Sequence, residues 1–301
     1  QGVRGGEHGM FYRSYSEKKD GAIRSFDLHS FHVKLLIICI LLLCTAIVVI
    51  CLFPTVWVFL ASFKDIREFR REVTIFPSKF DFSVFVKTWN DLKFVKYYVN
   101  SLIMVIGCVI CSVVFNGLIA YSLALLKPKG HKIITGLVMW SLLIPSTTSV
   151  VALFVNVNRL GLSRSFIPIW LSYGANAFIV VLYKQFFERM PSDLFEAAKL
   201  DGCNVLQVFM KILLPLSTPI ISVATIFTVT AAWSDFLFPF LILNGTGKET
   251  VMIAIFSFRT SNATDVEVLR AILFSIIPPT ILFLIFQKQI TDGAAAGALK
   301  E

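Results

Sequence analysis

The stretch SLIMVIGCVICSVVFNGLIAYSLALL, residues 101–126, decides the fold class because it contains no charged side chain. A helix needs about 20 apolar residues to cross about 30 Å of hydrocarbon. A second uncharged run covers residues 35–62. It is too long for the core of a signal peptide, and no small-residue cleavage pattern follows it, so we expect it to be retained. These runs predict a membrane protein.

The composition of the whole chain agrees with a membrane protein. Of 301 residues, 56% are apolar and 16% are charged, whereas about a quarter of the residues in a soluble domain are charged. The net charge is +9, but the basic residues are scattered between the apolar runs and form no stripe for nucleic acid. We expect contact with membrane lipid and no nucleic acid.

The cysteines indicate neither a metal site nor a redox site. Five of the six lie in apolar runs. Cys108 and Cys111 form a CxxC pair, but no second pair or nearby histidine completes a zinc site. We therefore predict no metal and no cofactor bound by this chain.

The pattern predicts an all-α fold, a polytopic membrane helical bundle with about six transmembrane helices. Residues 1–34 precede the first span, and the Gly-rich residues 1–9 are interpreted as a remnant of cloning. Val251 to Phe258 is apolar but too short to cross, and either a re-entrant piece or a packed loop helix would fit it. The predicted spans are 35–62, 100–126, 133–155, 166–186, 212–243 and 269–288; the last five belong to a core of residues 100–290, and 291–301 form a tail.

A polar stretch from Pro191 to Pro219 reads as a helix, a stop and a second helix. Pro191 suits a helix start, and Asp193 complements the positive end of the helix dipole. Gly202 can adopt the left-handed conformation that ends a helix. Asn204 and Gln207 then have the spacing of a capping box. We therefore predict a short exposed helix held at an angle to the membrane.

The first of these two helices carries residues suited to docking another protein. Ala197 and Ala198 are small enough to let a partner approach the backbone, and Glu196 and Asp201 offer charge-assisted hydrogen bonds to arginine or lysine. From the residues alone, a solvated loop helix that binds nothing is the favoured interpretation.

The same residues carry a family resemblance. Glu196-Ala-Ala, Asp201-Gly and Ile212-Leu-Leu-Pro215 resemble the EAA signature of bacterial ABC import permeases. Over residues 35 to 300 the chain is similar to the maltose-type carbohydrate permeases, and most similar to the six-span subunit of the heterodimeric pair. Ser234 departs from the asparagine usual there, and Cys203 from a small residue. Further matches are Pro54, Ser62-Phe-Lys64, Asn100-Ser-Leu102, Ala120 to Ala124, Trp233-Ser-Asp235 and Gly293 to Lys300.

The resemblance implies a type I ABC importer permease fold in the bacterial cytoplasmic membrane. It implies a second homologous permease, two cytoplasmic ATPases that hold ATP and Mg, and an extracytoplasmic sugar-binding protein. Lysine and arginine counts barely favour one orientation, but the EAA loop, 188–215, must face the ATPases. Both termini would then be cytoplasmic and loop 63–99 extracytoplasmic. The implied ATPase-coupling residues are Glu196, Ala197, Ala198, Leu200, Asp201, Gly202 and Pro215.

Three residues are candidates for the transport pathway or its gate, namely Asp235, Trp233 and Tyr173. An acid in an apolar run usually faces a bundle interior or a watery cavity, although a helix-cap role also fits Asp235. Gly245 to Thr250 fails the nucleotide-loop pattern, so ATP hydrolysis must come from a partner. No catalytic residue is predicted, and the alternatives are an ion-coupled secondary transporter and, behind it, a membrane enzyme.

Overall fold

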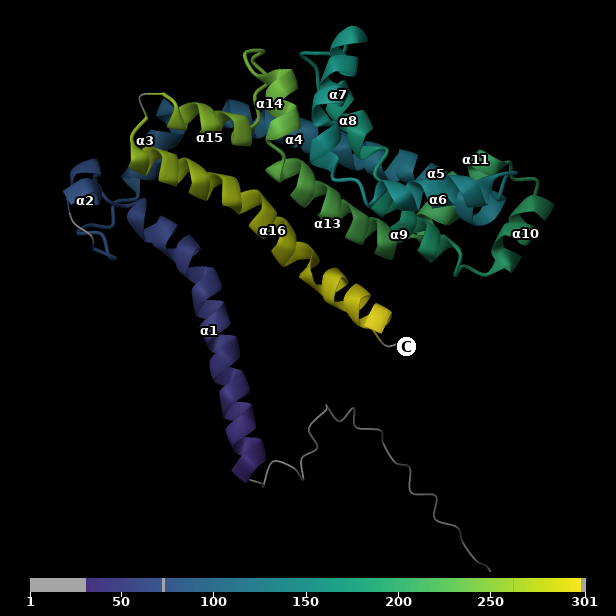
Figure 1. Cartoon of the computed structure of the whole chain (residues 1–301), viewed down its shortest axis with the longest axis horizontal. Coiled ribbons are helices and arrows are strands. Elements are labelled where there is room, and N and C mark those ends of the chain that lie inside the picture. The colour runs from purple at the N-terminus through teal and green to yellow at the C-terminus, as the bar shows by residue number, and fades with distance from the viewer. Residues whose placement is uncertain (1–30, 72–73, 262, 299–301) are drawn as a thin grey trace, which may run out of the picture. The chain divides into compact units, whose positions relative to one another are not determined.

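The computed structural model describes residues 31–71, 74–261 and 263–298, and these residues form helices and no strand (Figure 1). The chain divides into two compact units, residues 1–57 and 58–301. Residues 1–30 and 299–301 lie outside the described part, so most of the predicted N-terminal segment 1–34 and the end of the predicted tail are not placed.

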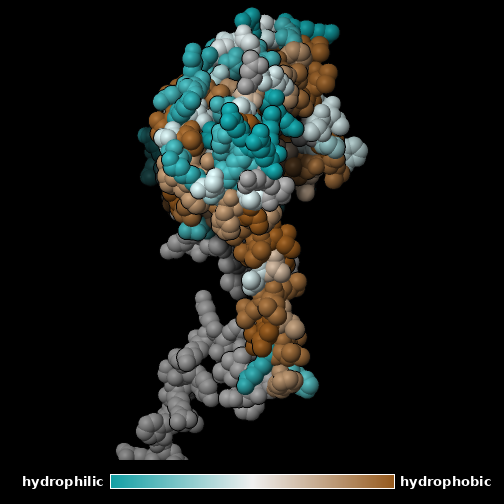
Figure 2. Space-filling model, turned by 90° about the vertical axis from the view of Figure 1, so that its left-hand side faces the viewer, coloured by the Kyte–Doolittle hydropathy of each residue, from teal (hydrophilic) through white to brown (hydrophobic). Residues whose placement is uncertain are grey.

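Helix α1 (Phe31–Ala61) is apolar around its whole circumference. Its large side chains are exposed along most of the helix, with Leu42 at 65% and Ile50 at 71%. The face of α1 seen in Figure 2 is hydrophobic, while hydrophilic side chains gather around α2 (Ile66–Arg71). A helix of 31 residues with no polar face fits hydrocarbon rather than water, which agrees with the predicted first span.

The second predicted span is one continuous helix, Phe94–Leu126, of 33 residues. Two of its turns are π-helical, and such turns often lie at functional sites. The helix ends at Lys127, whose φ of 45° is left-handed. Its four segments are α4 (Phe94–Cys111), η2 (Ser112–Asn116), α5 (Gly117–Tyr121) and η3 (Ser122–Leu126).

In the second unit, the short helices of two loop regions lie at opposite ends (Figure 1). Helices α10 and α11 lie at one end, and α3 and α15 at the other. The remaining elements are α3 (Ser83–Asp91), α6 (His131–Ser141), α7 (Ser146–Arg159), α8 (Ile167–Tyr173), α9 (Ala177–Phe187), α10 (Ser192–Leu200), α11 (Val205–Val208), η4 (Phe209–Leu213), α12 (Leu214–Leu216), α13 (Thr218–Ser234), α14 (Leu237–Leu243), α15 (Val251–Arg259) and α16 (Asp265–Ala298).

Within the described part, three helices are long and apolar enough to cross a membrane: α1, Phe94–Leu126 and Asp265–Gln287. Two bent pairs also qualify. Ile167–Tyr173 with Ala177–Phe187 is bent by 43°, and Val205–Leu216 with Thr218–Ser234 is bent by 83°.

Two of the six predicted spans are not single helices in the structure. Residues 133–155 are not one helix, because α6 ends at Ser141 and α7 begins only after Pro145, whose backbone is extended. Residues 212–243 are divided among η4, α12, α13 and α14. Proline residues and an extended backbone at Asp235 interrupt that run.

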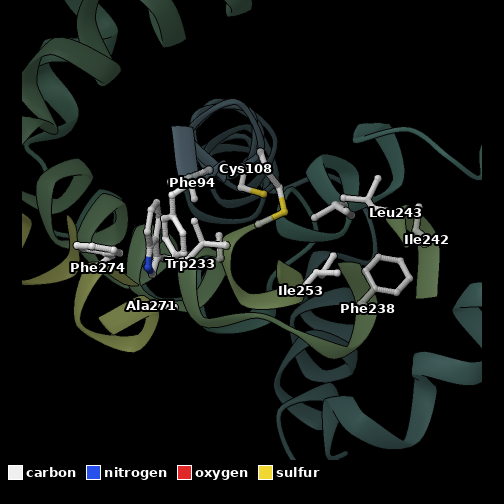
Figure 3. Packing of buried hydrophobic residues seen from close by; sticks show 14 of the residues in the cluster. Phe94, Cys108, Trp233, Phe238, Ile242, Leu243, Ile253, Ala271 and Phe274 are labelled. Atoms are coloured by element: carbon white, nitrogen blue, oxygen red, sulfur yellow. The ribbon is translucent and has the colours of Figure 1, made fainter. Parts of the chain in front are cut away.

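Two clusters of buried side chains hold the second unit together. The first joins α4, α13, α14, α15 and α16. In Figure 3 Phe94, Trp233 and Phe274 lie on one side of Cys108, and Phe238, Ile242 and Leu243 on the other. Helix α15 contributes buried side chains and packs against α4 and α16. The second cluster joins α5, η3, α9, α10, η4 and α13.

A buried arginine ties the segment after α1 to α16 and α3. Arg270 is 7% exposed. Its Nε donates to the Ser62 carbonyl at 2.8 Å and its Nη2 to the Lys64 carbonyl at 3.2 Å. Its Nη1 donates to Thr88 Oγ1 at 3.2 Å. The guanidinium thus satisfies carbonyl groups left unpaired past the end of a helix.

Candidate coupling loop and translocation cavity

Helix α10 is bounded by local signals that the sequence carries. It starts directly after Pro191 and has Asp193 in its first turn. At its end Gly202 has a φ of +77°. The Gly202 N–H donates to the Lys199 carbonyl at 3.1 Å, and the Cys203 N–H donates to the Ala198 carbonyl at 3.0 Å. This pair of bonds is the Schellman motif, which closes the last turn of a helix.

The next helix begins with the predicted capping box. Asn204 Oδ1 accepts from the Gln207 N–H at 2.8 Å, and Gln207 Oε1 accepts from the Asn204 N–H at 2.9 Å. The chain then runs through the π-helical η4 and α12 to the 83° bend. At the bend Ser217 is buried, and its hydroxyl donates to the Leu213 carbonyl at 2.6 Å. Helix α13 follows directly.

The two alanines of the EAA motif lie in different environments. Ala198 is 3% exposed and belongs to the second core cluster, together with Phe209. Ala197 is exposed. The prediction that both small side chains face a partner therefore needs a correction for Ala198, because its small size lets α10 pack onto the chain's own core. The outer surface of α10 presents Glu196, Ala197 and Leu200, and Leu200 is 89% exposed.

A cavity of about 490 Å³ lies beside α10. Its walls include Phe195, Glu196 and Lys199 from α10 and Lys127 from the link after η3. The basic link and the EAA loop therefore share one end of the second unit, as expected if both lie on the same side of a membrane.

A larger cavity, of about 970 Å³, lies among α6, α7, α8, α9, α13 and α14, and we call it the translocation cavity. Part of its wall is apolar, with Leu142, Ile144 and Val150. The other part is polar and is formed by Ser141, Thr147, Ser149, Ser172, Tyr173, Asn176, Ser234 and Asp235. Polar side chains of this kind are unfavourable against lipid tails.

Tyr173 and Asp235, two of the predicted pathway residues, come together in this cavity. Both line it, and the Asp235 carboxylate interacts with the Tyr173 hydroxyl and with the Phe238 N–H. Asp235 lies between the end of α13 and the start of α14, and it lines the cavity. Of the two predicted alternatives for this acid, the structure places it in the cavity wall, and the start of α14 has no side-chain cap hydrogen bond.

Trp233 does not line the cavity. Its side chain is 5% exposed and lies in the first core cluster, where its Nε1 donates to the Ser275 carbonyl at 2.9 Å. It fastens α13 to α16. The pathway prediction treated Trp233 as a ring that could stack on a sugar, but in the structure this ring packs in the core, and the helix ends at Ser234 before the chain reaches Asp235.

Asn116 was not predicted, yet it shapes the translocation cavity. It is fully buried in η2, and its Nδ2 donates to the Tyr173 carbonyl at 2.9 Å. Its Oδ1 accepts from the Asn176 N–H at 2.9 Å. These bonds satisfy the backbone where α8 breaks before α9. Ser112 extends the network, because its Oγ is 3.2 Å from Asn116 Nδ2 and 2.9 Å from Thr228 Oγ1.

A sequence signal for Asn116 existed. An amide inside an uncharged span must find a partner in the bundle, and Asn116 is the only asparagine within residues 101–126. The identity of its partners could not be read from spacing, since Tyr173 is 57 positions away.

The fold and these sites define a multi-pass helical membrane protein with one polar loop docked on its core and one polar cavity. The chain belongs to the family of binding-protein-dependent transport system inner membrane components, whose model matches residues 35–293. It is thus an ABC importer permease, and members of this family are membrane permeases that are not themselves catalytic.

Several named relatives are similar over most of their length. The chain is 30% identical to the probable ABC transporter permease protein YurM of Bacillus subtilis, covering 82% of this chain and 83% of the relative. It is 30% identical to the trehalose/maltose transport system permease protein MalG of Thermococcus litoralis, with coverages of 84% and 92%. It is 26% identical to the diacetylchitobiose uptake system permease protein NgcG of Streptomyces coelicolor, with coverages of 84% and 85%.

A solved structure has the same fold. A chain of a bacterial ABC transporter involved in the import of the acidic polysaccharide alginate superposes with a TM-score of 0.76. The match covers 86% of this chain and 98% of that chain, at 22% sequence identity. The predicted all-α type I permease fold is confirmed.

Proposed function

We propose that the chain forms half of the translocation pathway of an ATP-driven importer for a carbohydrate, most consistent with an oligosaccharide. A second homologous permease supplies the other half, two cytoplasmic ATPases supply the energy, and an extracytoplasmic sugar-binding protein delivers the cargo. Relatives named for maltose and diacetylchitobiose transport support the substrate class. In this arrangement the EAA loop and both termini are cytoplasmic.

The observation that carries the proposal is the exposed surface of α10. Leu200 is 89% exposed although it is a large apolar side chain on a short polar helix. Such a side chain gains most by entering a groove on a partner. Glu196 and Asp201 lie beside it and can pair with basic residues at the rim of that groove.

The same helix is built to transmit movement. Ala198 anchors α10 to the core, and Phe209 of η4 packs in the same cluster, 5.7 Å from the ring of Tyr121. The Schellman motif and the capping box fix the angle between α10 and α11. A push on Leu200 would therefore pass through Pro215 to the bend at Ser217 and on to α13, which borders the translocation cavity.

The docking role is tested by Leu200→Asp. A charged side chain in an apolar groove is strongly unfavourable, so we expect the ATPase to be lost from the affinity-purified assembly while the second permease is retained. Leu160→Asp is the matched control, because Leu160 is 71% exposed and also ends a helix just before a left-handed glycine. ATPase retention by Leu200→Asp would contradict the docking surface.

The coupling role is tested by Gly202→Pro. Proline cannot adopt the φ of +77° and lacks the N–H that closes the Schellman motif. We expect the assembly to hydrolyse ATP without sugar uptake. Gly161→Pro is the control, since Gly161 has a φ of +69° and an equivalent bond to the Asn158 carbonyl. Normal uptake by Gly202→Pro would reject the coupling assignment, and purification without any ATPase would favour an ion-coupled transporter.

A further inference from the structure

We propose that the translocation cavity selects its cargo by charge, accepting neutral or cationic glycosyl units and disfavouring uronic acids and other anionic sugars. The inference rests on the proposed function, because it takes this cavity to be one wall of the sugar pathway. It adds a substrate class that neither the family nor the fold decides.

The charge of the cavity wall is the first observation. Among the described residues that line it, Asp235 is the single carboxylate, and lysine, arginine and histidine do not occur. The carboxylate interacts with the Tyr173 hydroxyl, which lines the same wall, and with the Phe238 N–H. An anionic sugar needs a basic partner to replace its water, and this wall offers it a negative charge instead.

The second observation is that the rest of the wall suits an uncharged sugar. The side chains of Thr147 and Ser234 are exposed. Neither hydroxyl makes a hydrogen bond to another described residue, so both can bond sugar hydroxyls. Tyr173 and Phe178 contribute rings, and Phe178 is 46% exposed. Aromatic rings pack against the apolar faces of sugars. The volume of about 970 Å³ is near the top of the range of about 300–1,000 Å³ for small-molecule sites.

The third observation is the apolar part of the wall. Leu142, Ile144 and Val150 lower the local dielectric around the cavity. Walls of this kind focus the field of a fixed charge and raise its effect on a passing ion. One carboxylate in this setting is expected to change the local preference between a cation and an anion by at least about tenfold.

The first test measures the charge preference without knowledge of the cargo. In the assembled transporter in lipid, Ser234→Cys is treated with a cationic methanethiosulfonate, the trimethylammonioethyl reagent, or an anionic one, the sulfonatoethyl reagent. Mass spectrometry reads modification at position 234, so the native cysteines can remain. Relative to a free thiol in solution, we expect the cationic reagent to be favoured at least about tenfold.

Two variants make this test specific. Adding Asp235→Asn to Ser234→Cys should bring the preference to within about threefold of the free thiol, because the fixed charge is gone. Thr218→Cys is exposed, lies outside the cavity, and should show no dependence on Asp235. An unchanged ratio in the Asp235→Asn background would overturn the inference. Failure of both reagents to reach position 234 would also overturn it, because the cavity would then be closed to water.

The second test separates the inference from the proposed function. The assembly with its binding protein is offered neutral trisaccharides and the corresponding uronides, and ATP-dependent uptake is measured. Uptake of a neutral or amino sugar together with little or no uptake of the uronide supports both statements. Uptake of a uronide at a comparable rate overturns charge selection and leaves the importer function standing. Uptake of no glycan, with every partner present, overturns the importer function itself.

Discussion

Replacement of Asn116 by leucine should loosen the translocation cavity from a position that does not line it. Leucine has a similar size but makes none of the three side-chain hydrogen bonds of Asn116. The Tyr173 carbonyl and the Asn176 N–H then remain without this partner at the break between α8 and α9. Hydrogen bonds between helices in a membrane contribute about 0.6 kcal/mol on average and up to about 1.7 kcal/mol each. We therefore expect Asn116→Leu to lower the free energy of unfolding by about 2–5 kcal/mol.

The assay is reversible unfolding of the purified protein in mixed micelles with increasing sodium dodecyl sulfate, followed by circular dichroism. Asn90→Leu is the control, because Asn90 is exposed and no side-chain hydrogen bond of it occurs in the described part of the chain; it should change the unfolding free energy by less than about 0.5 kcal/mol. If Asn116→Leu does not accumulate, Ser112→Ala removes one link of the network and should cost about 1 kcal/mol. Wild-type stability of Asn116→Leu would refute the reasoning.

Two further predictions concern packing and polar contacts elsewhere in the second unit. Gly107→Ala places a methyl group 2.2 Å from the ring of Trp170 and should destabilise the protein by about 1–3 kcal/mol, whereas Gly136→Ala, with no atom within 4 Å, should not; equal melting temperatures of the two variants would contradict the close helix contact. Arg270→Gln should cost about 2–4 kcal/mol in chemical unfolding, because backbone carbonyls lose their donors, while Arg70→Gln breaks only an exposed ion pair and should cost less than about 1 kcal/mol. Similar losses of unfolding free energy in the two variants would show that the buried hydrogen bonds of Arg270 add no stability.

The parts of the structure that the sequence predicted well depend on neighbours within a few positions. The left-handed Gly202, the capping box of Asn204 and Gln207, and the charge-free spans are all encoded locally. Their hydrogen bonds span three to five residues, so spacing alone is sufficient to infer them.

The missed features depend on partners far away in the chain. Arg270 bonds a carbonyl 208 positions away, and Asn116 bonds one 57 positions away. Trp233 was a pathway candidate because its ring could stack on a sugar, yet it packs in the core, and the helix end at Ser234 separates it from Asp235. The break of the third predicted span at Pro145 follows from tertiary packing that lets a proline interrupt a helix in a bundle. The sequence shows the position of a proline but not which residues pack against it in the bundle.

The hydrogen bonds within the coupling loop affect how much conformational entropy the loop loses when a partner docks. Its turn is closed by the chain's own backbone and by the Asn204 and Gln207 side chains, so it needs no ATPase to hold its shape. Docking then involves little loss of conformational entropy. In the proposed assembly, an ATPase could shift or release α10 in each turnover without refolding the loop, and the affinity between the subunits could be modest.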